Sequence, residues 1–156
     1  MIIQFRADVA PRGKQRARTV RLPNGHTTSY TPRETVRFET AIAYAYKRTC
    51  RGSSFAPYEP LQMTVYEYMP IPQSVSKRKQ EDLDGDWHTK KPDASNVLKS
   101  VEDALNKLAY ADDGQIAALH VYKIYSTQPR IEVTIQKLQS RKEQNHGIDV
   151  NSVPCE

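Results

Sequence analysis

The side chains of this sequence that are best suited to metal or acid–base chemistry gather between Lys91 and Gln115. Five carboxylates lie in this segment: Asp93, Glu102, Asp103, Asp112 and Asp113. Adjacent carboxylates such as Asp112 and Asp113 repel each other unless a cation lies between them, and Mg²⁺ with oxygen ligands is the usual solution. A turn at Gly114 could return this pair towards the earlier acids. The segment is therefore a candidate metal site, and the alternative is an ordinary surface turn rich in aspartate.

The residues that precede the acidic pair have the spacing of an amphipathic helix. Asp93 is a favourable N-cap residue, and Pro92 disfavours helical backbone at Lys91. One face of the helix is apolar: Val97, Leu98, Val101, Ala104, Leu105 and Leu108. The opposite face is polar: Ser95, Asn96, Lys99, Glu102, Asp103 and Asn106. We expect the apolar face in the core, and the polar face either carries chemistry or is a solvated surface with i,i+4 pairs.

The order of these residues resembles the RusA family of Holliday-junction resolvases. The pattern is K-P-D-x-x-N-x-x-K-x-x-x-D-A-L-N from Lys91 to Asn106, followed by D-D-x-Q-I from Asp112 to Ile116. Looser similarity extends over residues 1–138. One position departs from the family, because Ser95 stands where a typical member has a second aspartate, a presumed metal ligand. Glu102 lies two helical turns beyond Ser95 on the same face, so Glu102 could supply the missing carboxylate.

The resemblance implies a metal-dependent DNA endonuclease. Its catalytic residues would be Asp93, Lys99 and Asp113, and the helical spacing from Ser95 adds Glu102 to them. Asp93, Asp112 and Asp113 would hold Mg²⁺, or Mn²⁺ in its place, and the ion would activate a water and stabilise the leaving oxygen. Lys99 would neutralise charge developing on the phosphate. The implied substrate is four-way junction DNA in recombination and repair, nicked symmetrically because a two-fold homodimer presents two identical sites.

A second function stays open at the level of sequence. A branched-DNA-binding module could keep the basic surface and have lost efficient cleavage through the serine at position 95. Composition does not separate these two functions, because acidic clusters beside basic patches also occur in proteins that cut nothing.

Basic residues are concentrated just ahead of the first helix expected along the chain. Between Pro11 and Gly25 there is no acid, and there are five cations: Arg12, Lys14, Arg16, Arg18 and Arg21. Like charges in a turn-rich segment repel one another unless counterions or phosphates screen them. We predict that Arg12, Lys14, Arg16 and Arg18 contact DNA, joined by Lys90, Lys91 and Asn96. The alternative is a solvated, partly mobile loop.

Length and composition agree with these expectations. The chain has 156 residues, which suits one domain, and 23 Lys and Arg against 18 Asp and Glu give a net charge of +5. This excess favours a polyanionic partner. Cys50 and Cys155 lack companions at metal-ligand or disulfide-framework spacing, which indicates a reducing compartment. No apolar run approaches the roughly 20 residues of a membrane span, so we expect a cytoplasmic protein without a membrane partner, in a bacterial or phage-infected cell.

The expected element order is β-α-β-α-β-β. Residues 2–9 predict a strand, and 31–50 a helix with Thr31 as N-cap and Glu34 completing a capping box. Residues 61–69 predict a strand, and 73–91 a long polar connection. The runs 116–125 and 130–138 predict a closing hairpin. The tail, residues 139–156, is expected to be disordered.

These elements predict a single α+β domain over residues 1–138, with a small mixed or antiparallel sheet and helices on one face. The other face of such a sheet would be left for a partner subunit, and the resemblance implies a homodimer.

Overall fold

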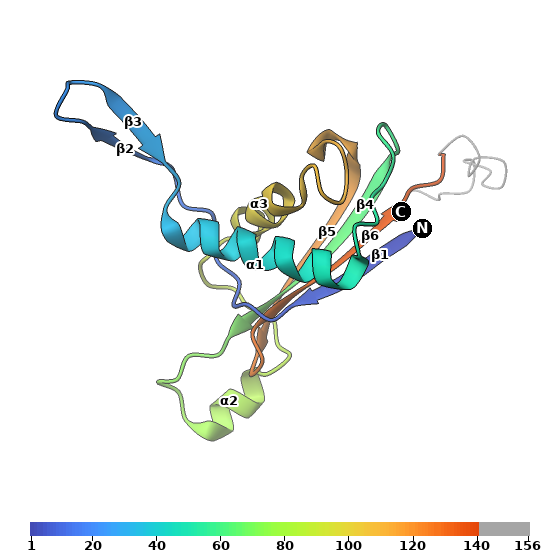
Figure 1. The fold of residues 1–156 in the computed structure, drawn as a ribbon. Coiled ribbons are helices and arrows are strands. Elements are labelled where there is room, and N and C mark those ends of the chain that lie inside the picture. The colour runs from blue at the N-terminus through green and yellow to red at the C-terminus, as the bar shows by residue number, and fades with distance from the viewer. Residues whose placement is uncertain (141–156) are drawn as a thin grey trace, which may run out of the picture.

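Four strands form a mixed sheet in the order β1–β6–β4–β5 (Figure 1). The computed structural model describes residues 1–140. The strands are β1 (Ile2–Ala7), β4 (Leu61–Pro70), β5 (Ile116–Ser126) and β6 (Arg130–Lys137). β6 is antiparallel to both of its neighbours, and β4 and β5 are parallel. The predicted α+β class with a mixed sheet is confirmed.

Two helices cover one face of this sheet, as expected from the sequence (Figure 1). They are α1 (Arg33–Cys50) and α3 (Ala94–Leu105). Alternate residues of β4 face them, and the buried side chains of α1 and α3 complete the core: Phe38, Ile42, Tyr46, Val97, Leu98, Val101 and Leu105. α3 is thereby fixed by its apolar face, and its polar face points away from the core.

The two last strands do not form the predicted hairpin. β4 lies between β5 and β6, so each pairs with β4 and neither pairs with the other. The three-residue link from Thr127 to Pro129 can reach over the end of β4, because strands two places apart are separated by only about 10 Å. Alternation along the sequence indicates strands, and it does not specify their partners.

Two segments predicted as irregular contain regular structure. β2 (Arg18–Arg21) and β3 (Thr27–Tyr30) form an exposed antiparallel arm that projects from the body (Figure 1). A turn with Gly25 at φ +84° joins them, a conformation that glycine adopts readily. The long polar connection contains α2 (Lys77–Leu83), which also projects from the body.

The helix boundaries differ slightly from the prediction. Pro32, not Thr31, is the N-cap of α1, and no side-chain capping hydrogen bond or capping box forms there. The carbonyl of Pro32 accepts the N–H groups of Thr35 and Val36, which places the helix start one residue later. α3 ends at Leu105, so Leu108 lies beyond the helix, although it still packs against the core.

The predicted tail falls mostly outside the described residues, since residues 141–156, including Cys155, are not among them. Among the helices of residues 1–140, none combines the length and apolar character of a membrane span.

Candidate active site

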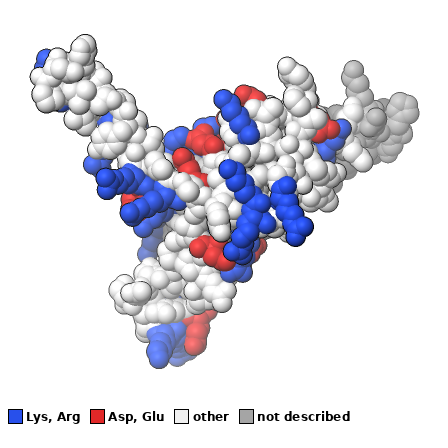
Figure 2. Space-filling view, in the orientation of Figure 1, with Lys and Arg blue, Asp and Glu red and all other residues white. Residues whose placement is uncertain are grey.

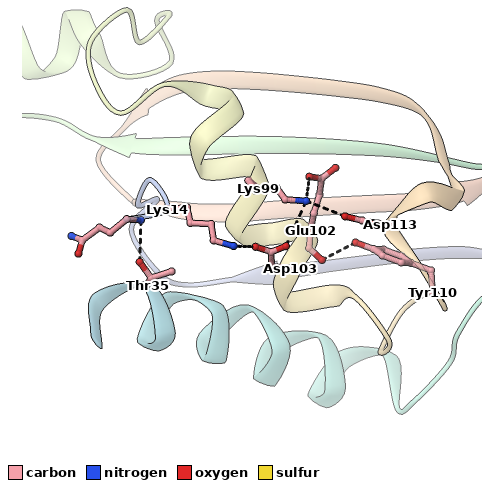
Figure 3. A network of polar contacts seen from close by, with 8 residues as sticks. Lys14, Thr35, Lys99, Glu102, Asp103, Tyr110 and Asp113 are labelled. Carbon is pink, nitrogen blue, oxygen red and sulfur yellow. Dashed lines mark hydrogen bonds and ion pairs between the residues drawn. The ribbon is translucent and has the colours of Figure 1, made fainter. Parts of the chain in front are cut away.

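Lys99 lies at the centre of a cluster of three carboxylates (Figure 3). Its Nζ is 3.0 Å from Asp113 Oδ2, 3.6 Å from Asp103 Oδ1 and 3.7 Å from Glu102 Oε2. Asp103 is also paired with Lys14, which arrives from the segment before β2. Lys99, Glu102 and Asp103 share the polar face of α3, as predicted, and Asp113 comes from the acidic turn. The turn therefore does return one carboxylate to the helix.

Gln115 holds the acidic turn in place. It is 9% exposed, and its Nε2 donates to the carbonyls of Ala56 at 2.8 Å and Glu59 at 3.2 Å. Its Oε1 accepts the N–H of Ala111 and of Asp112. These bonds anchor the short 3₁₀ turn η1 (Asp113–Gln115) to the loop before β4. The position of Asp113 is thus set by a buried amide two residues away.

Asp112 and Tyr110 support the same turn. Asp112 Oδ1 accepts the N–H of Gly114 at 2.8 Å, so one oxygen of this carboxylate already caps η1. The hydroxyl of Tyr110 donates to the carbonyl oxygen of Glu102 at 3.0 Å (Figure 3). Tyr110 is buried, and its bond ties the turn to the last turn of α3.

The environment shifts the pKa values of two acids of the cluster in opposite directions. Burial raises the pKa of Glu102, and Lys99 opposes this shift. The hydrogen bond from Lys99 lowers the pKa of Asp113, and the same bond raises the pKa of Lys99. Two nearby carboxylates with divergent pKa values are typical of sites where one group carries a proton and the other carries charge.

Asp93 lies at the N-cap of α3, as predicted, and its carboxylate makes no capping hydrogen bond. Only its carbonyl is used, because it accepts the N–H groups of Asn96 and Val97. The carboxylate is exposed and remains open to a ligand. Ser95 is also exposed and lies one residue into the same helix.

The carboxylates around Lys99 do not by themselves form a metal site in the described residues. Within residues 1–140, no three His, Cys, Asp or Glu side chains form a group that could hold a metal ion. The ammonium of Lys99 nevertheless stands where three carboxylates converge, and oxygen ligands are those that Mg²⁺ prefers. The set Asp93, Asp112 and Asp113 stays a prediction.

Comparison with known proteins decides the family. The family described as Endodeoxyribonuclease RusA matches residues 8–136. The chain belongs to the RusA family. It is also 46% identical over 83 residues to the uncharacterized protein YqaN of Bacillus subtilis (strain 168), covering 51% of this chain and 58% of that protein. It is 38% identical over 53 residues to the crossover junction endodeoxyribonuclease rusA of Lactococcus phage r1t, covering 33% of this chain and 40% of that protein. These alignments span about half the length of the two curated relatives.

Two basic residues of this RusA chain that were predicted to contact DNA have acidic partners within the protein. Lys14 pairs with Asp103, and Arg12 Nη1 lies 3.1 Å from Glu34 Oε2. These partners come from α3 and α1, so the absence of acids in the local sequence did not reveal them. Lys14 therefore helps to attach the start of the arm to the acidic cluster.

The other predicted DNA contacts lie at the surface. Arg16 and Arg18 are exposed at the base of the arm and have no ion pair within residues 1–140. Lys90, Lys91 and Asn96 are exposed at the start of α3. Figure 2 shows Lys and Arg where the arm joins the body, with Asp and Glu beside them. Their roles toward DNA stay predictions.

Sequence reasoning missed the supporting residues Gln115, Tyr110 and Lys123. Gln115 was noted only as part of the family pattern, and the signal available was its place directly after the acidic pair. Lys123 sits inside a strand, yet its Nζ donates to the carbonyls of Lys90 at 2.6 Å and Pro92 at 2.7 Å. Lysine is rarely buried without a partner, so a lysine at a half-buried strand position indicates a contact with another part of the fold.

Proposed function

We propose that this protein is a Mg²⁺-dependent endonuclease that resolves four-way DNA junctions by paired, symmetric nicks. The observation that carries the proposal is the cluster in which Lys99 meets Asp113, Glu102 and Asp103. Lys99, Asp103 and Asp113 match the RusA family pattern, and Glu102 does not belong to that pattern. The phage relative is named as a crossover junction endodeoxyribonuclease, which supports a crossover-junction substrate.

Asp93 and Asp113 are the residues that would hold the metal ion, with Asp112 beside them. When bound, such an ion supplies charge neutralisation and lowers the pKa of a coordinated water. Lys99 donates to a non-bridging phosphate oxygen and offsets the charge that develops as the P–O bond breaks. Glu102 replaces the carboxylate missing at Ser95, and its raised pKa lets it carry a proton at a higher pH than an ordinary glutamate.

The exposed arginines of the arm support DNA binding. Arg16, Arg18 and Arg21 lie on or next to β2, which is exposed along its whole length. Their charges have no acidic partner within the described residues, so phosphates can compete for them without displacing an ion pair. Lys90 and Lys91 continue the positive surface to Asp93.

We also propose a homodimer through the face of the sheet that α1 and α3 leave open. Tyr66 of β4 stacks on Tyr122 of β5 with ring centroids 4.8 Å apart, and Tyr68 lies 6.1 Å from Tyr66. Arg130 covers the ring of Tyr68 at 3.5 Å. Aromatic and arginine side chains of this kind are enriched at protein interfaces. Two copies would present two identical sites to a junction.

The second candidate is a branched-DNA-binding module that cuts poorly. The observation that favours it is the serine at position 95, which is exposed on α3 and supplies no carboxylate. In this function the cluster around Lys99 would be a structural ion-pair network.

A cleavage assay on a labelled synthetic four-way junction, with and without Mg²⁺, tests the proposed function. Matched linear duplex of the same sequence is the control substrate. We expect nicks at symmetric positions in opposing strands of the junction only when Mg²⁺ is present. Binding without any cleavage in Mg²⁺ or Mn²⁺, with cleavage gained in Ser95→Asp, would establish the binding module instead.

A further inference from the structure

A cavity of about 570 Å³ lies directly beside the start of α3. The segment from Ala10 to Gln15, apart from Lys14, contributes a first wall, and His88 with the residues from Lys90 to Pro92 contributes a second wall. Its apolar surface comes from Met69, Ile71, Pro72 and Tyr125. Pro92 lines the cavity and immediately precedes Asp93. Whatever enters the cavity is therefore a neighbour of the proposed catalytic centre.

Direct contacts fix the first wall. The N–H of Gln15 donates to Thr35 Oγ1 at 3.2 Å, and the N–H of Lys14 donates to the carbonyl of Asn96 at 3.0 Å. A Cβ at Gly13 would lie 2.6 Å from Asn96 Nδ2 and 3.0 Å from Pro92 Cβ, so this wall packs closely against the start of α3. The wall is preformed, which lowers the cost of binding a ligand.

Hydrogen bonds of Lys123 and His88 fix the second wall to β5. Lys123 Nζ donates to two carbonyls of this wall, those of Lys90 and Pro92. The N–H of His88 donates to the carbonyl of Lys123 at 2.9 Å, and its ring lies 4.5 Å from that of Tyr125. His88 is 9% exposed, and its Nδ1 has no hydrogen-bond partner within the described residues. One ring nitrogen of this cavity-lining imidazole is thus left without a protein partner, and a polar ligand could satisfy it.

The chemistry of the cavity suits a nucleobase. Its lining combines apolar side chains with the ring of Tyr125, and its rim carries the exposed cations Lys90 and Lys91 together with the Arg12–Glu34 ion pair. A base offers a flat apolar face and polar edges, and its attached phosphates match the cationic rim. Burial beside Lys123 lowers the pKa of His88, which favours a neutral ring able to exchange hydrogen bonds with a base edge.

We infer that the cavity between residues 10–15 and 88–92 receives one unstacked nucleobase of the junction, next to the phosphate at Asp93. This inference rests on the proposed function. At the exchange point of a four-way junction, base pairs end without a continuous stack on one side, so a base leaves at lower cost than inside a duplex. The cavity would thereby favour junctions over linear DNA.

Filling the cavity tests the inference. Ile71→Trp places a large side chain in the cavity, and Val75→Trp adds the same group to a half-exposed neighbour that does not line it. Binding to a labelled junction and to matched duplex is measured without divalent metal. We expect Ile71→Trp to weaken junction binding at least about tenfold, the loss of one base contact, and to leave duplex binding unchanged. We expect Val75→Trp to bind both DNAs like the parent.

Removal of single bases identifies the occupant. Junctions that carry one abasic nucleotide, moved step by step through the exchange point, are bound to the parent and to Ile71→Trp. At one abasic position we expect the parent and Ile71→Trp to bind the junction with equal affinity. The base that the tryptophan would exclude from the cavity is already missing from that junction.

Three results separate the possible failures. Parent-like junction binding by Ile71→Trp overturns the inference, and so does a loss that no abasic position relieves, which would point to another occupant such as an apolar peptide. A parent protein that does not distinguish junction from duplex contradicts the proposed function instead. If the tryptophan variant does not fold, the same measurements are made on Ile71→Phe.

Discussion

The departure from the family pattern at Ser95 makes Glu102 the most informative single residue. Glu102 is largely buried, close to Lys99, and its pKa is raised by burial. Those properties suit a group that takes over a catalytic role, but they also occur in structural ion-pair networks. The distinction depends on activity and not on geometry.

We therefore expect Glu102→Gln to lower junction cleavage by at least about 100-fold, the range of a lost acid–base or ligand group. The double change Ser95→Asp with Glu102→Gln should restore part of the rate, because the carboxylate returns to the position where other family members have it. Single-turnover cleavage with saturating protein measures both variants. Glu81→Gln, an exposed residue of α2, is the control. Parent-like cleavage by Glu102→Gln would remove Glu102 from the site.

Glu67 is the other residue whose chemistry departs from its surroundings. It lies on the helix-covered face of β4, is fully buried, and neither carboxylate oxygen has a hydrogen-bond partner within residues 1–140. Burial raises its pKa to about 8, and the opposing effect of Lys123, its partner in register on β5, is smaller. The folded protein therefore binds a proton at Glu67 that the unfolded chain releases at a lower pH.

This proton makes stability depend on pH in a defined direction. The contribution of Glu67 is fully present below the unfolded pKa of 4.5 and is lost as pH rises through about 8. We expect Glu67→Gln to match the parent near pH 5 and to exceed its unfolding free energy by more than about 2 kcal/mol above pH 8. Urea unfolding across this pH range measures the difference. Parallel profiles for parent and variant would show that Glu67 has an ordinary pKa.

At the scale of elements, the arm formed by β2 and β3 has no core of its own. All eight of its strand residues are exposed. An exposed two-stranded hairpin is marginally stable in water, and in the proposed function its basic side chains would gain favourable contacts with DNA phosphates. The arm is thus not part of the domain core, and we propose it as a DNA-binding element.

Replacing Arg16 and Arg18 by Ala should weaken junction binding and make its salt dependence less steep. Each lost phosphate contact reduces the slope of log K against log salt by about 0.9, so the double variant should differ by about 2. Fluorescence anisotropy over a salt series measures the slope. Arg48→Ala with Arg51→Ala, at the far end of α1, is the charge-matched control. An unchanged slope would leave the arm as a solvated hairpin.

The elements also show which features local sequence can predict. The apolar stripe of α3 and the alternation of β4 follow from periodicity, because burial on one side imposes it. The insertion of β4 between β5 and β6 depends on pairing across the whole sheet. The sequence of the link after Ser126 carries no information about that pairing. In the site, the acids of α3 and Asp113 were predicted. The hydrogen bonds by which Gln115 fixes the acidic turn, and the ion pair of Lys14 with Asp103, were not predicted, because these partners are distant in sequence.

At the scale of the molecule, paired nicking requires two sites in fixed relation. The open face of the sheet, with Tyr66 stacked between Tyr68 and Tyr122, is the surface proposed for the second copy. We expect Tyr66→Glu to shift the protein from dimer to monomer, since a carboxylate would be buried without a partner. Tyr44→Glu, on the exposed side of α1, is the control.

Sedimentation velocity measures the assembly, and the pattern of cuts on a junction gives a second readout. The monomer should produce single, uncoordinated nicks in place of paired ones. A parent protein that sediments as a monomer at micromolar concentration, or a Tyr66→Glu variant that remains dimeric, would contradict the assignment of this face.

The most direct test of the central claim separates cleavage from binding at the two carboxylates proposed to hold the metal ion. Asp93→Asn and Asp113→Asn are compared with the parent on a labelled junction in Mg²⁺, with Asp82→Asn on α2 as control. We predict a loss of nicking of at least about 1,000-fold in both variants, with junction binding equal or tighter because negative charge near phosphate is removed. Parent-like nicking by either variant would contradict the account.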